Sequence, residues 1–325
     1  MLARHEFLRL AAAMPFVVLL SCNAFAQAYP SKPVRVIVSS GPGGQTDTTA
    51  RLVTAKLTQS LGQSFFVENM GGAAGNMAMM TVARAAPDGY TILATGSSIA
   101  TNASLFSKLS YDPHKDFAPI SLLNSSPHVL VIHPSIAAIS VNELVALAKA
   151  NPGKYSYASA GPATPAHLAG ELFKLAFGVD VTHVPYKGGG PGIVATLGGH
   201  TSMAVAALPT GVTHVRDGNL RALGMFSSKR ASALPGIPTM AEATGQDLPA
   251  DIVNGFLAPA KTPRTLIDSL HREIVKIMAA PDTRERLATM GFDPVASTPD
   301  EFAAWIKTEA LRWGKVVREA KITVD

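Results

Sequence analysis

Short apolar runs alternate with glycine-rich segments and with helical periodicities along most of the 325-residue chain. Residues 34–39 (VRVIVS) are a β-branched run that leads into the glycine-rich residues 41–44. The apolar residues that follow recur at the spacing of one helix face, and they are Ala50, Val53, Leu57 and Leu61. The pattern predicts a buried strand, a loop and a helix, in that order.

The same order returns further along the chain. Strands are expected at residues 91–95, 155–159, 181–184 and 201–205. Each of these runs leads into a segment rich in small, hydroxyl or proline residues, which is typical of a turn before a helix. Alternating strands and helices of this density predict an α/β fold with mostly parallel sheets.

One helix start is especially clear. Thr164 is placed to cap a helix, and Pro165 is favoured at the first helical position. Leu168, Leu172 and Leu175 are then spaced to form the buried stripe of this helix.

The first 26 residues have the pattern of a secretory signal peptide. Arg4 and Arg9 form a basic start, residues 10–20 are an uninterrupted apolar run, and residues 24–26 read Ala-Phe-Ala. The apolar run is shorter than the ~20 residues that a membrane-spanning helix requires. We therefore expect a cleaved signal peptide over residues 1–26 and a mature protein in the periplasm.

A lipid anchor is the alternative to free secretion. Residues 19–22 (LLSC) resemble a lipobox, in which Cys22 would carry the lipid, although Leu20 is an unusual residue at its position. Cys22 is also the only cysteine of the chain. A chain cleaved after Ala26 therefore forms neither disulfides nor thiolate metal sites.

Composition indicates a well-packed protein of two domains that carries a mild positive charge. Hydrophobic residues make up 47% of the chain and charged residues 16%, which is enough apolar surface for a core. The net charge is +5, without basic runs interleaved with aromatic residues. We expect no nucleic-acid partner, whereas a modest positive field favours anionic ligands.

The glycine- and hydroxyl-rich loops predict a binding site built largely from backbone. In parallel sheets, ligands bind beyond the carboxyl ends of the strands, where these loops fall. Helix starts near Thr46 and Thr164 offer unpaired N–H groups that suit the two ends of a dicarboxylate. The alternative is that these loops are ordinary turns and caps. Asp47 is either a ligand contact or part of the helix cap.

The enzyme interpretations fail on spacing. No segment completes a dinucleotide fingerprint or a P-loop, so we expect no cofactor. Ser97 and Ser159 follow strands but lack the flanking glycines of a hydrolase elbow, which leaves a serine hydrolase as a weak alternative. The scattered histidines, which are expected to be structural or on the surface and to bind no metal, are His128, His133, His183, His200 and His214.

Extended segments of the chain carry a specific resemblance. They include "YPSKPVRVIV", "GPGGQTDTTAR", "VENMGGAAGNMA", "ARAAPDGYTIL", "NPGKYSYASAGPATPAHLAGELF" and "THVPYKGGGP". In this order they resemble the Bug family (TctC-like) of tripartite tricarboxylate transporter substrate-binding proteins. The resemblance implies a two-lobed type II periplasmic-binding-protein fold (Venus flytrap) without catalytic activity. It also implies a monomer that captures a small carboxylate and delivers it to membrane permease subunits. An extracellular sensor for a signalling system is the alternative.

The resemblance further implies the site and the lobes. First-lobe ligand contacts would be Gly43, Gly44, Thr46, Asp47, Asn69, Ser97 and Ser98. Second-lobe contacts would be Ser159, Gly161, Thr164, His167, Ala206 and Ala207. Where family members often have Phe-Asp-Asn-Leu-Pro, this chain has Ala206 in place of the acid, which argues against an amino-acid ligand. An aliphatic or aromatic mono- or dicarboxylate is expected in its place.

By the same resemblance, the chain crosses between the lobes near residues 124–129 and again near residues 250–256. Residues 27–127 and 251–325 would form lobe 1, and residues 128–250 would form lobe 2. The amphipathic C-terminal helix is expected to pack on lobe 1 as part of its core, through Phe302, Trp305, Ile306, Trp313 and Val316.

Overall fold

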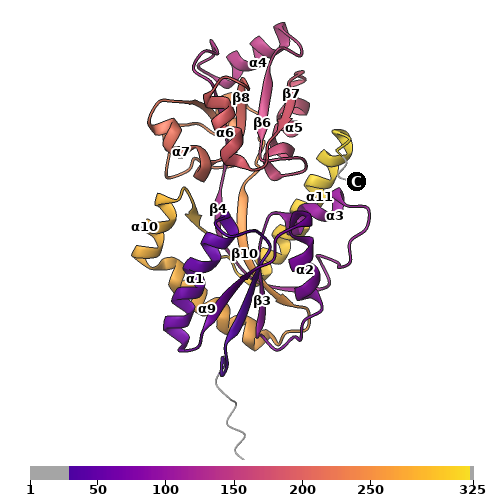
Figure 1. The fold of residues 1–325 in the computed structure, drawn as a ribbon, viewed down its shortest axis with the longest axis vertical. Helices are drawn as coiled ribbons and strands as arrows, with labels where there is room; N and C mark the ends of the chain where they lie inside the picture. Colours follow the sequence, from indigo (N-terminus) through magenta and orange to yellow (C-terminus); the bar gives the residue numbers. More distant parts are fainter. Residues whose placement is uncertain (1–28, 323–325) are drawn as a thin grey trace, which may run out of the picture.

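A computed structural model describes residues 29–322. The predicted signal peptide and the alternative lipid site at Cys22 lie outside the described residues. Two lobes stand one above the other in Figure 1, and each is built around its own sheet with helices on both faces. The predicted two-lobed α/β architecture is confirmed.

The first lobe contains a six-stranded sheet in the order β11-β4-β10-β3-β1-β2. Its N-terminal elements are β1 (Val34–Val38), α1 (Gln45–Leu61), β2 (Phe65–Asn69), the 3-10 turn η1 (Ala73–Gly75), α2 (Asn76–Ala83), β3 (Thr91–Gly96), α3 (Ser98–Leu105) and β4 (Phe117–Ser126). Its C-terminal elements are β10 (Ile252–Pro259), α9 (Arg264–Ala279), α10 (Pro281–Thr289), β11 (Asp293–Pro294) and α11 (Pro299–Glu319).

The second lobe contains a five-stranded sheet in the order β7-β6-β8-β5-β9. Its elements are β5 (His128–Ile132), α4 (Val141–Ala150), β6 (Ser156–Ser159), α5 (Pro165–Phe177), β7 (Thr182–Pro185), α6 (Gly189–Leu197), β8 (Met203–Ala207), α7 (Leu208–Arg216), β9 (Arg221–Phe226) and α8 (Met240–Thr244). The chain passes between the lobes from β4 to β5 and again between β9 and β10.

Each sheet contains the parallel strands that were expected, and it is mixed in direction because of the strands at the crossings. β1 is parallel to β2 and β3, and β6 is parallel to β7 and β8. The strands next to the crossings run against their neighbours: β10 against β3 and β4, and β5 against β8 and β9. A chain that leaves one lobe and later returns through an adjacent strand must reverse its direction, which local sequence patterns do not report.

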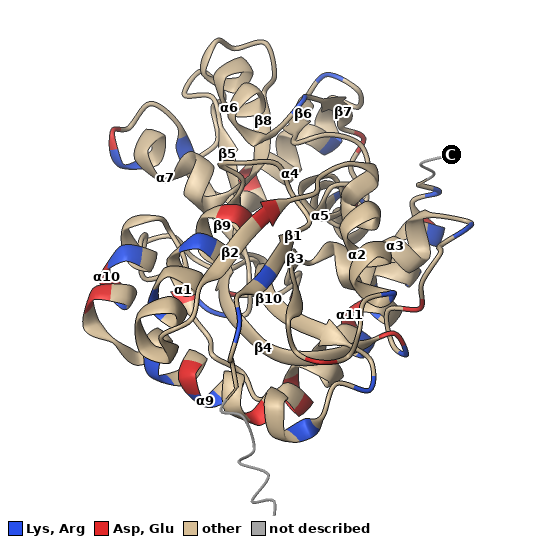
Figure 2. Cartoon of the chain, turned by 60° about the horizontal axis from the view of Figure 1, so that its bottom comes forward, with Lys and Arg blue, Asp and Glu red and all other residues tan. Residues whose placement is uncertain are grey.

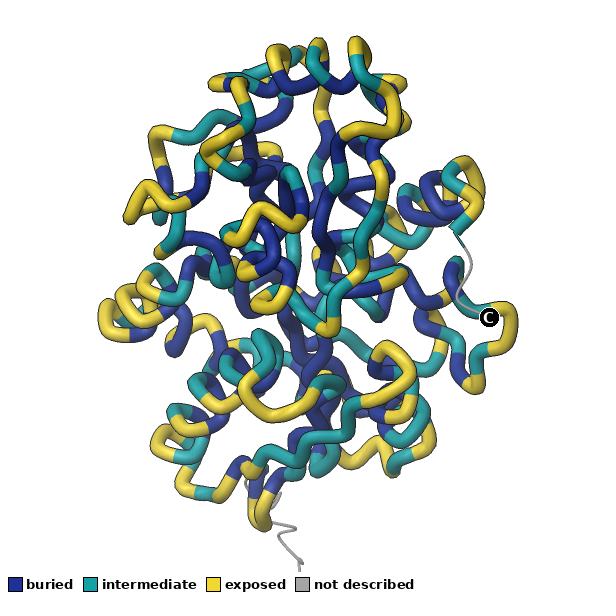
Figure 3. Tube along the Cα trace, turned by 45° about the horizontal axis from the view of Figure 1, so that its top comes forward, coloured by how far each residue is buried: buried dark blue, intermediate teal, exposed yellow. Residues whose placement is uncertain are grey.

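The predicted strand at residues 34–39 is confirmed as β1, and it is buried on both faces. Val36 packs in one cluster with α1 and α9, whereas Ile37 packs in a second cluster with α2 and α11. Both side chains are fully buried. Burial of one such side chain stabilises a fold by about 1.5–3 kcal/mol. Figure 3 shows the same arrangement for both lobes, with buried strands inside and exposed residues on the outer helices.

The helix predicted after Thr164 is confirmed as α5, but its buried stripe is only partly as expected. Leu168 is fully buried, whereas Leu175 is 43% exposed. The helix packs closely against Tyr157 at Gly170, where a Cβ atom would lie 2.3 Å from the Tyr157 ring. The face of α5 that packs on the sheet therefore includes Gly170, and Leu175 lies outside it.

The C-terminal helix spans both lobes, which corrects the expectation that it lies on the first lobe alone. Phe302 and Ile306 pack in a first-lobe cluster with Trp305 beside them. Trp313 and Val316 belong to a cluster made mostly of second-lobe residues, and α11 contacts α5 of that lobe. Figure 1 shows α11 rising from the lower lobe beside the upper one. With 21 residues, α11 is about 30 Å long, which is enough to reach both lobes.

Candidate ligand-binding site

A cavity of about 450 Å³ lies between the lobes, where the chain crosses from one to the other. First-lobe residues in its lining are Gly43, Gly44, Gln45, Thr46 and Ile252. Second-lobe residues are His128, Ala160, Thr164, Pro165, Ala166, Gly189, Val205, Ala206, Ala207 and Thr210. This volume is in the range of small-molecule sites.

Four helices begin at this cavity. α1 starts after Gly44, which makes no side-chain cap, and α6 and α7 also start without side-chain caps. α5 starts at Thr164 with Pro165 at its first position. The first N–H groups of a helix have no partner within the helix and carry partial positive charge. Four such starts in one cavity favour an anionic group.

The remaining lining is apolar or uncharged. Val205, Ala206, Ala207 and Ile252 form an apolar wall, and no Asp, Glu, Lys or Arg is among the described residues that line the cavity. A neighbouring hollow of about 300 Å³ shares Gly43, Gln45 and Thr210 with the cavity and adds Met290 and Phe292. The site therefore combines backbone donors with apolar surface.

Six predicted site residues line the cavity: Gly43, Gly44, Thr46, Thr164, Ala206 and Ala207. The other seven are Asp47, Asn69, Ser97, Ser98, Ser159, Gly161 and His167. They make hydrogen bonds within each lobe, as described next, and none of them is in the described lining.

Asp47 holds the glycine-rich loop in place. Its buried carboxylate accepts hydrogen bonds from the N–H of Gly43 at 2.9 Å, from Asn69 at 2.8 Å and from Arg51 at 3.0 Å. Burial alone would raise the pKa of Asp47, but the bonds from Arg51, Gly43 and Asn69 outweigh it and lower the pKa. The ionised carboxylate of Asp47 thus stabilises the conformation of the glycine-rich loop. Gly44, and not Asp47, is the N-cap residue of α1.

Ser97 contacts the segment that returns from the second lobe to the first, at Asp251 and Val253. Its hydroxyl oxygen accepts a hydrogen bond from the N–H of Val253 at 3.2 Å and lies 3.4 Å from the carbonyl of Asp251. Ser98 begins α3, with its hydroxyl 3.5 Å from that of Thr95. Both serines therefore act within the first lobe.

Ser159 and His167 belong to a stacked cluster behind the start of α5. Ser159 Oγ lies 2.7 Å from Nε2 of His183 and accepts a hydrogen bond from Gly161 N–H at 3.2 Å. Nδ1 of His167 accepts from Ala163 N–H at 2.9 Å. The two imidazole rings stack with centroids 4.0 Å apart, and the Tyr157 ring stacks on His183.

Both histidines of this cluster are held neutral at ordinary pH. Burial, followed by the neighbouring His167, lowers the pKa of His183 to about 4. Burial also lowers the pKa of His167, against the attraction of Glu171. The sequence contains no local sign that His183 reaches Ser159, because the contact joins β6 and β7 through tertiary structure alone.

Sequence patterns missed several lining residues, among them Gln45, His128, Gly189, Thr210 and Ile252. His128 was expected to be structural or on the surface, and it is a buried residue of the cavity wall. Pro209 at the first turn of α7 was a usable signal for a third helix start, because proline favours that position.

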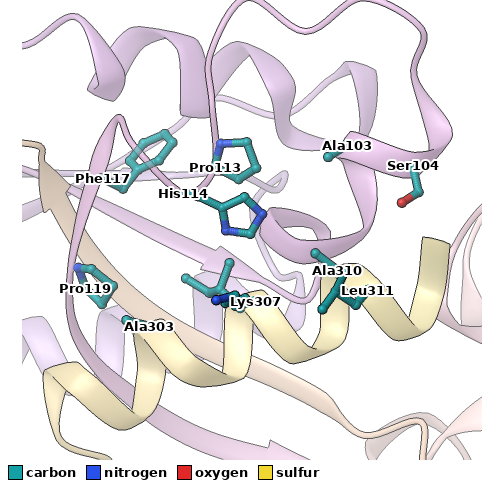
Figure 4. A pocket seen from close by; sticks show the side chains of 11 residues that line it. Ala103, Ser104, Pro113, His114, Phe117, Pro119, Ala303, Lys307, Ala310 and Leu311 are labelled. Atoms are coloured by element: carbon teal, nitrogen blue, oxygen red, sulfur yellow. The ribbon is translucent and has the colours of Figure 1, made fainter.

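A larger hollow of about 530 Å³ lies elsewhere, on the first lobe (Figure 4). Figure 4 shows its side chains between α11 on one side and the end of α3, the segment before β4 and the start of β4 on the other, with Phe117 and Leu311 contributing apolar surface. None of the described residues that line it belongs to the first turn of a helix. The hollow thus lacks the convergent backbone donors of the cavity between the lobes.

The charged side chains of the outer helices do not indicate a second binding site. Figure 2 shows blue and red segments interspersed on the outer helices, including α9 and α10. Within residues 29–322 no cluster of three or more potential metal ligands occurs. Over the same residues, no helix combines the length and apolarity needed to cross a membrane.

Two lobes with a donor-rich cavity at their junction define a solute-binding protein. The model of the tripartite tricarboxylate transporter family receptor (TctC) matches residues 49–322, and the chain belongs to this family. This confirms the resemblance drawn from the sequence. The family consists of periplasmic solute-binding receptors and not of enzymes, so the serine hydrolase alternative is set aside.

Three similar proteins illustrate the match. BugT of Bordetella pertussis is 38% identical over 90% of this chain and 91% of its own. R. palustris Rpa4515, solved with adipate, is 31% identical with a TM-score of 0.81, over 91% of this chain and 99% of that one. MatC from Rhodopseudomonas palustris, solved with bound malate, is 31% identical with a TM-score of 0.76, over 89% and 100%.

Proposed function

We propose that this chain captures a small carboxylate in the periplasm and delivers it to the permease subunits of a tripartite tricarboxylate-type transporter. The observation that carries the proposal is the convergence of four helix starts on one uncharged cavity between the lobes. Charge-assisted hydrogen bonds from backbone N–H groups are worth about 1.5–3 kcal/mol each. Two or three of them would hold a carboxylate without an arginine or lysine.

The bound acid lacks an ammonium group. An ammonium group in the cavity would need a carboxylate partner, and Ala206 stands where an acid would have served. Asp47 is the nearest acid of the loop, but its oxygens already accept from Gly43, Arg51 and Asn69. An unpaired ammonium group in such a site would be costly. The apolar wall from Val205 to Ala207 suits an aliphatic or aromatic body instead.

Similar proteins support this ligand class. Rpa4515 was solved with adipate and MatC with malate, and neither molecule carries an ammonium group. Family membership supports delivery to a permease, and the periplasmic location of family members supports export by the signal peptide over residues 1–26.

A thermal-shift panel of matched pairs tests the ligand class. Succinate with aspartate, and glutarate with glutamate, differ only in the ammonium group. A bound ligand raises the unfolding temperature by mass action. We expect a shift with at least one dicarboxylate and a smaller shift with its amino-acid counterpart. Shifts with the amino acids alone would contradict the proposal.

A further inference from the structure

His128 is the one ionisable side chain among the described residues that line the cavity between the lobes. It opens β5 at the crossing and is 2% exposed. Its Nδ1 lies 2.6 Å from the carbonyl oxygen of Ala250. A carbonyl only accepts, so Nδ1 carries the hydrogen, and Nε2 of the neutral ring is left as an acceptor.

The ring stays neutral in the free protein. Burial lowers the pKa of His128 to about 4, against a smaller opposing effect of the bond to Ala250. Charged groups on the neighbouring segments have partners of their own. Asp47 of α1 binds Arg51, and Glu171 of α5 accepts from Tyr157 at 2.8 Å and from Lys174 at 2.9 Å.

Asp251 follows Ala250 in the return crossing and is the remaining acid close to the ring. Burial, more than any other cause, raises the pKa of Asp251 to about 6. Ser227, Arg312 and Lys229 act in the opposite direction and lower this pKa, whereas the charge of Glu309 of α11 raises it further. The charged groups that act on Asp251 are therefore in part those of α11, and His128 is not among them.

His128 thus presents an acceptor in a cavity whose other polar side chains are those of Gln45, Thr46, Thr164 and Thr210. A fully ionised carboxylate oxygen pointed at Nε2 would place two acceptors together. A ligand O–H group in the same position would form a hydrogen bond. We infer that Nε2 of His128 accepts a hydrogen bond from an O–H group of the ligand and thereby selects among carboxylic acids. The inference rests on the proposed carboxylate-binding function.

Two kinds of ligand supply such a group. A hydroxy acid such as malate carries its own hydroxyl, and it would bind without a change in protonation. A plain diacid such as adipate has no hydroxyl group, so its binding would require the uptake of one proton. This proton would be shared between one ligand carboxylate and Nε2 of His128. In the first case, affinity is nearly independent of pH around neutrality. In the second, it depends on pH.

The sign of this pH dependence follows from linkage. A carboxylate beside Nε2 raises the pKa of His128 in the complex above its value in the free protein. Between the two values the complex holds more protons than the separated partners. Affinity is therefore greatest at lower pH and falls as pH rises through the value in the complex, by at most about tenfold per pH unit.

Calorimetry with succinate, L-malate and adipate separates the two cases. Each acid is titrated at pH 6 and pH 8 in two buffers of different ionisation enthalpy, which reports the protons taken up. We expect malate to bind about three- to tenfold more tightly than succinate without proton uptake, or the plain diacids to take up as much as one proton. The preference for malate or the proton uptake with the plain diacids supports the inference, provided that the effect disappears when His128 is replaced.

Two variants test that dependence. His128→Asn retains a side-chain N–H toward Ala250 but has no atom at the position of Nε2, so both effects should disappear. His128→Gln places an amide near that position, so it should keep a hydroxyl preference but lose proton uptake. Thermal unfolding of both variants verifies that they are folded.

Three outcomes would overturn the inference. Succinate, malate and adipate could bind the wild type with equal affinity and no proton uptake. The wild-type effects could also persist unchanged in His128→Asn. In both cases the acids still bind, so the proposed function stands. Binding of none of the acids to the wild type would instead remove the proposed function, and the inference with it.

Discussion

The hydroxyl of Thr46 donates a hydrogen bond of 2.8 Å to the side-chain oxygen of Asn254, a residue 208 positions away in sequence. The amide of Asn254 in turn donates to Asn124 at 2.9 Å, and Asn124 donates to Thr49 at 3.0 Å. Asn254 and Asn124 are fully buried. This chain of hydrogen bonds ties the start of α1 to both strands that lead into the crossings, β4 and β10.

Loss of the Thr46 hydroxyl should therefore destabilise the first lobe. Thr46→Val keeps the shape of the side chain but leaves the buried oxygen of Asn254 without its donor, which costs about 1–3 kcal/mol of the free energy of unfolding. Thr46→Ser keeps the hydroxyl and serves as the control. Urea unfolding measures both variants. Equal stabilities of the two would show that the bond to Asn254 contributes nothing.

Removal of the Asp47 charge should loosen the glycine-rich loop. Asp47→Asn keeps an acceptor for Gly43 N–H but loses the ion pair with Arg51. The pKa of Asp47 is lowered by folding, so its stabilisation is present above about pH 4 and is lost as pH falls through the folded value.

We expect Asp47→Asn to be less stable than the wild type at pH 7 and to approach it in acid. Denaturant unfolding at pH 7 and pH 3 measures this difference. Arg264 pairs with Asp268 at the surface, and Asp268→Asn is the matched control for an exposed pair, with an expected cost below about 1 kcal/mol. A deficit of Asp47→Asn that is the same at both pH values would contradict the role of its charge.

Acid should weaken the histidine cluster of the second lobe. His183 has its pKa lowered to about 4 in the folded protein, and an unfolded histidine has a value of about 6.5. Between these values the unfolded chain binds more protons, so stability is complete above about pH 6.5 and falls as pH drops toward 4. One such group changes stability by at most about 1.4 kcal/mol per pH unit.

Thermal unfolding at pH 7.5 and pH 5 tests this prediction in the wild type and in His183→Gln. The variant should lose less stability on acidification, and His128 should account for part of the loss that remains. His200, an exposed histidine, provides the control variant His200→Gln. An acid sensitivity of His183→Gln equal to that of the wild type would exclude His183 as its source.

The second-lobe half of α11 should make a large contribution to stability. Trp313 is 3% exposed in the second-lobe cluster, and its Nε1 donates to Glu309 at 2.8 Å. Trp313→Ala should cost about 3–5 kcal/mol, since it opens a large cavity. Trp305→Ala, at a half-buried position of the same helix, should cost less. A loss for Trp313→Ala no greater than that for Trp305→Ala would contradict this prediction.

Local patterns were sufficient for much of the fold but not for the directions of its strands. The strand over Val34–Val38 and the helix starts near Thr46 and Thr164 are encoded by neighbouring residues, and they were predicted. The antiparallel course of β5 and β10 depends on pairing between distant segments. The incorrect assignment of Trp313 to the first lobe has the same cause. Periodicity identifies the apolar face of a helix but not the lobe that covers this face.

The site was predictable to a similar extent. Glycines and helix starts near Thr46 and Thr164 gave the backbone part of the cavity wall. No local motif surrounds Asn124, His128 or Asn254. Their roles depend on contacts between segments that are distant in sequence. Ser159 and His167 were expected at the ligand, and both contact His183 and are absent from the described lining of the cavity.

The central claim is that main-chain N–H groups at the starts of helices hold the ligand carboxylate, and Gln45 offers a direct test. Gln45 is the first residue of α1, where proline is tolerated, and the preceding Gly44 has the extended conformation that proline requires, with φ −67° and ψ 162°. Gln45→Pro therefore removes one N–H at the cavity wall and preserves the helix. Gln45→Ala removes the side chain and keeps the N–H.

Calorimetry with adipate on these two variants is the most direct measurement. We predict that Gln45→Pro binds about 10- to 100-fold more weakly than Gln45→Ala, which corresponds to the loss of one charge-assisted hydrogen bond of about 1.5–3 kcal/mol. Thermal unfolding of the unliganded variants should show similar stability. Equal affinity of Gln45→Pro and Gln45→Ala for adipate would contradict the account.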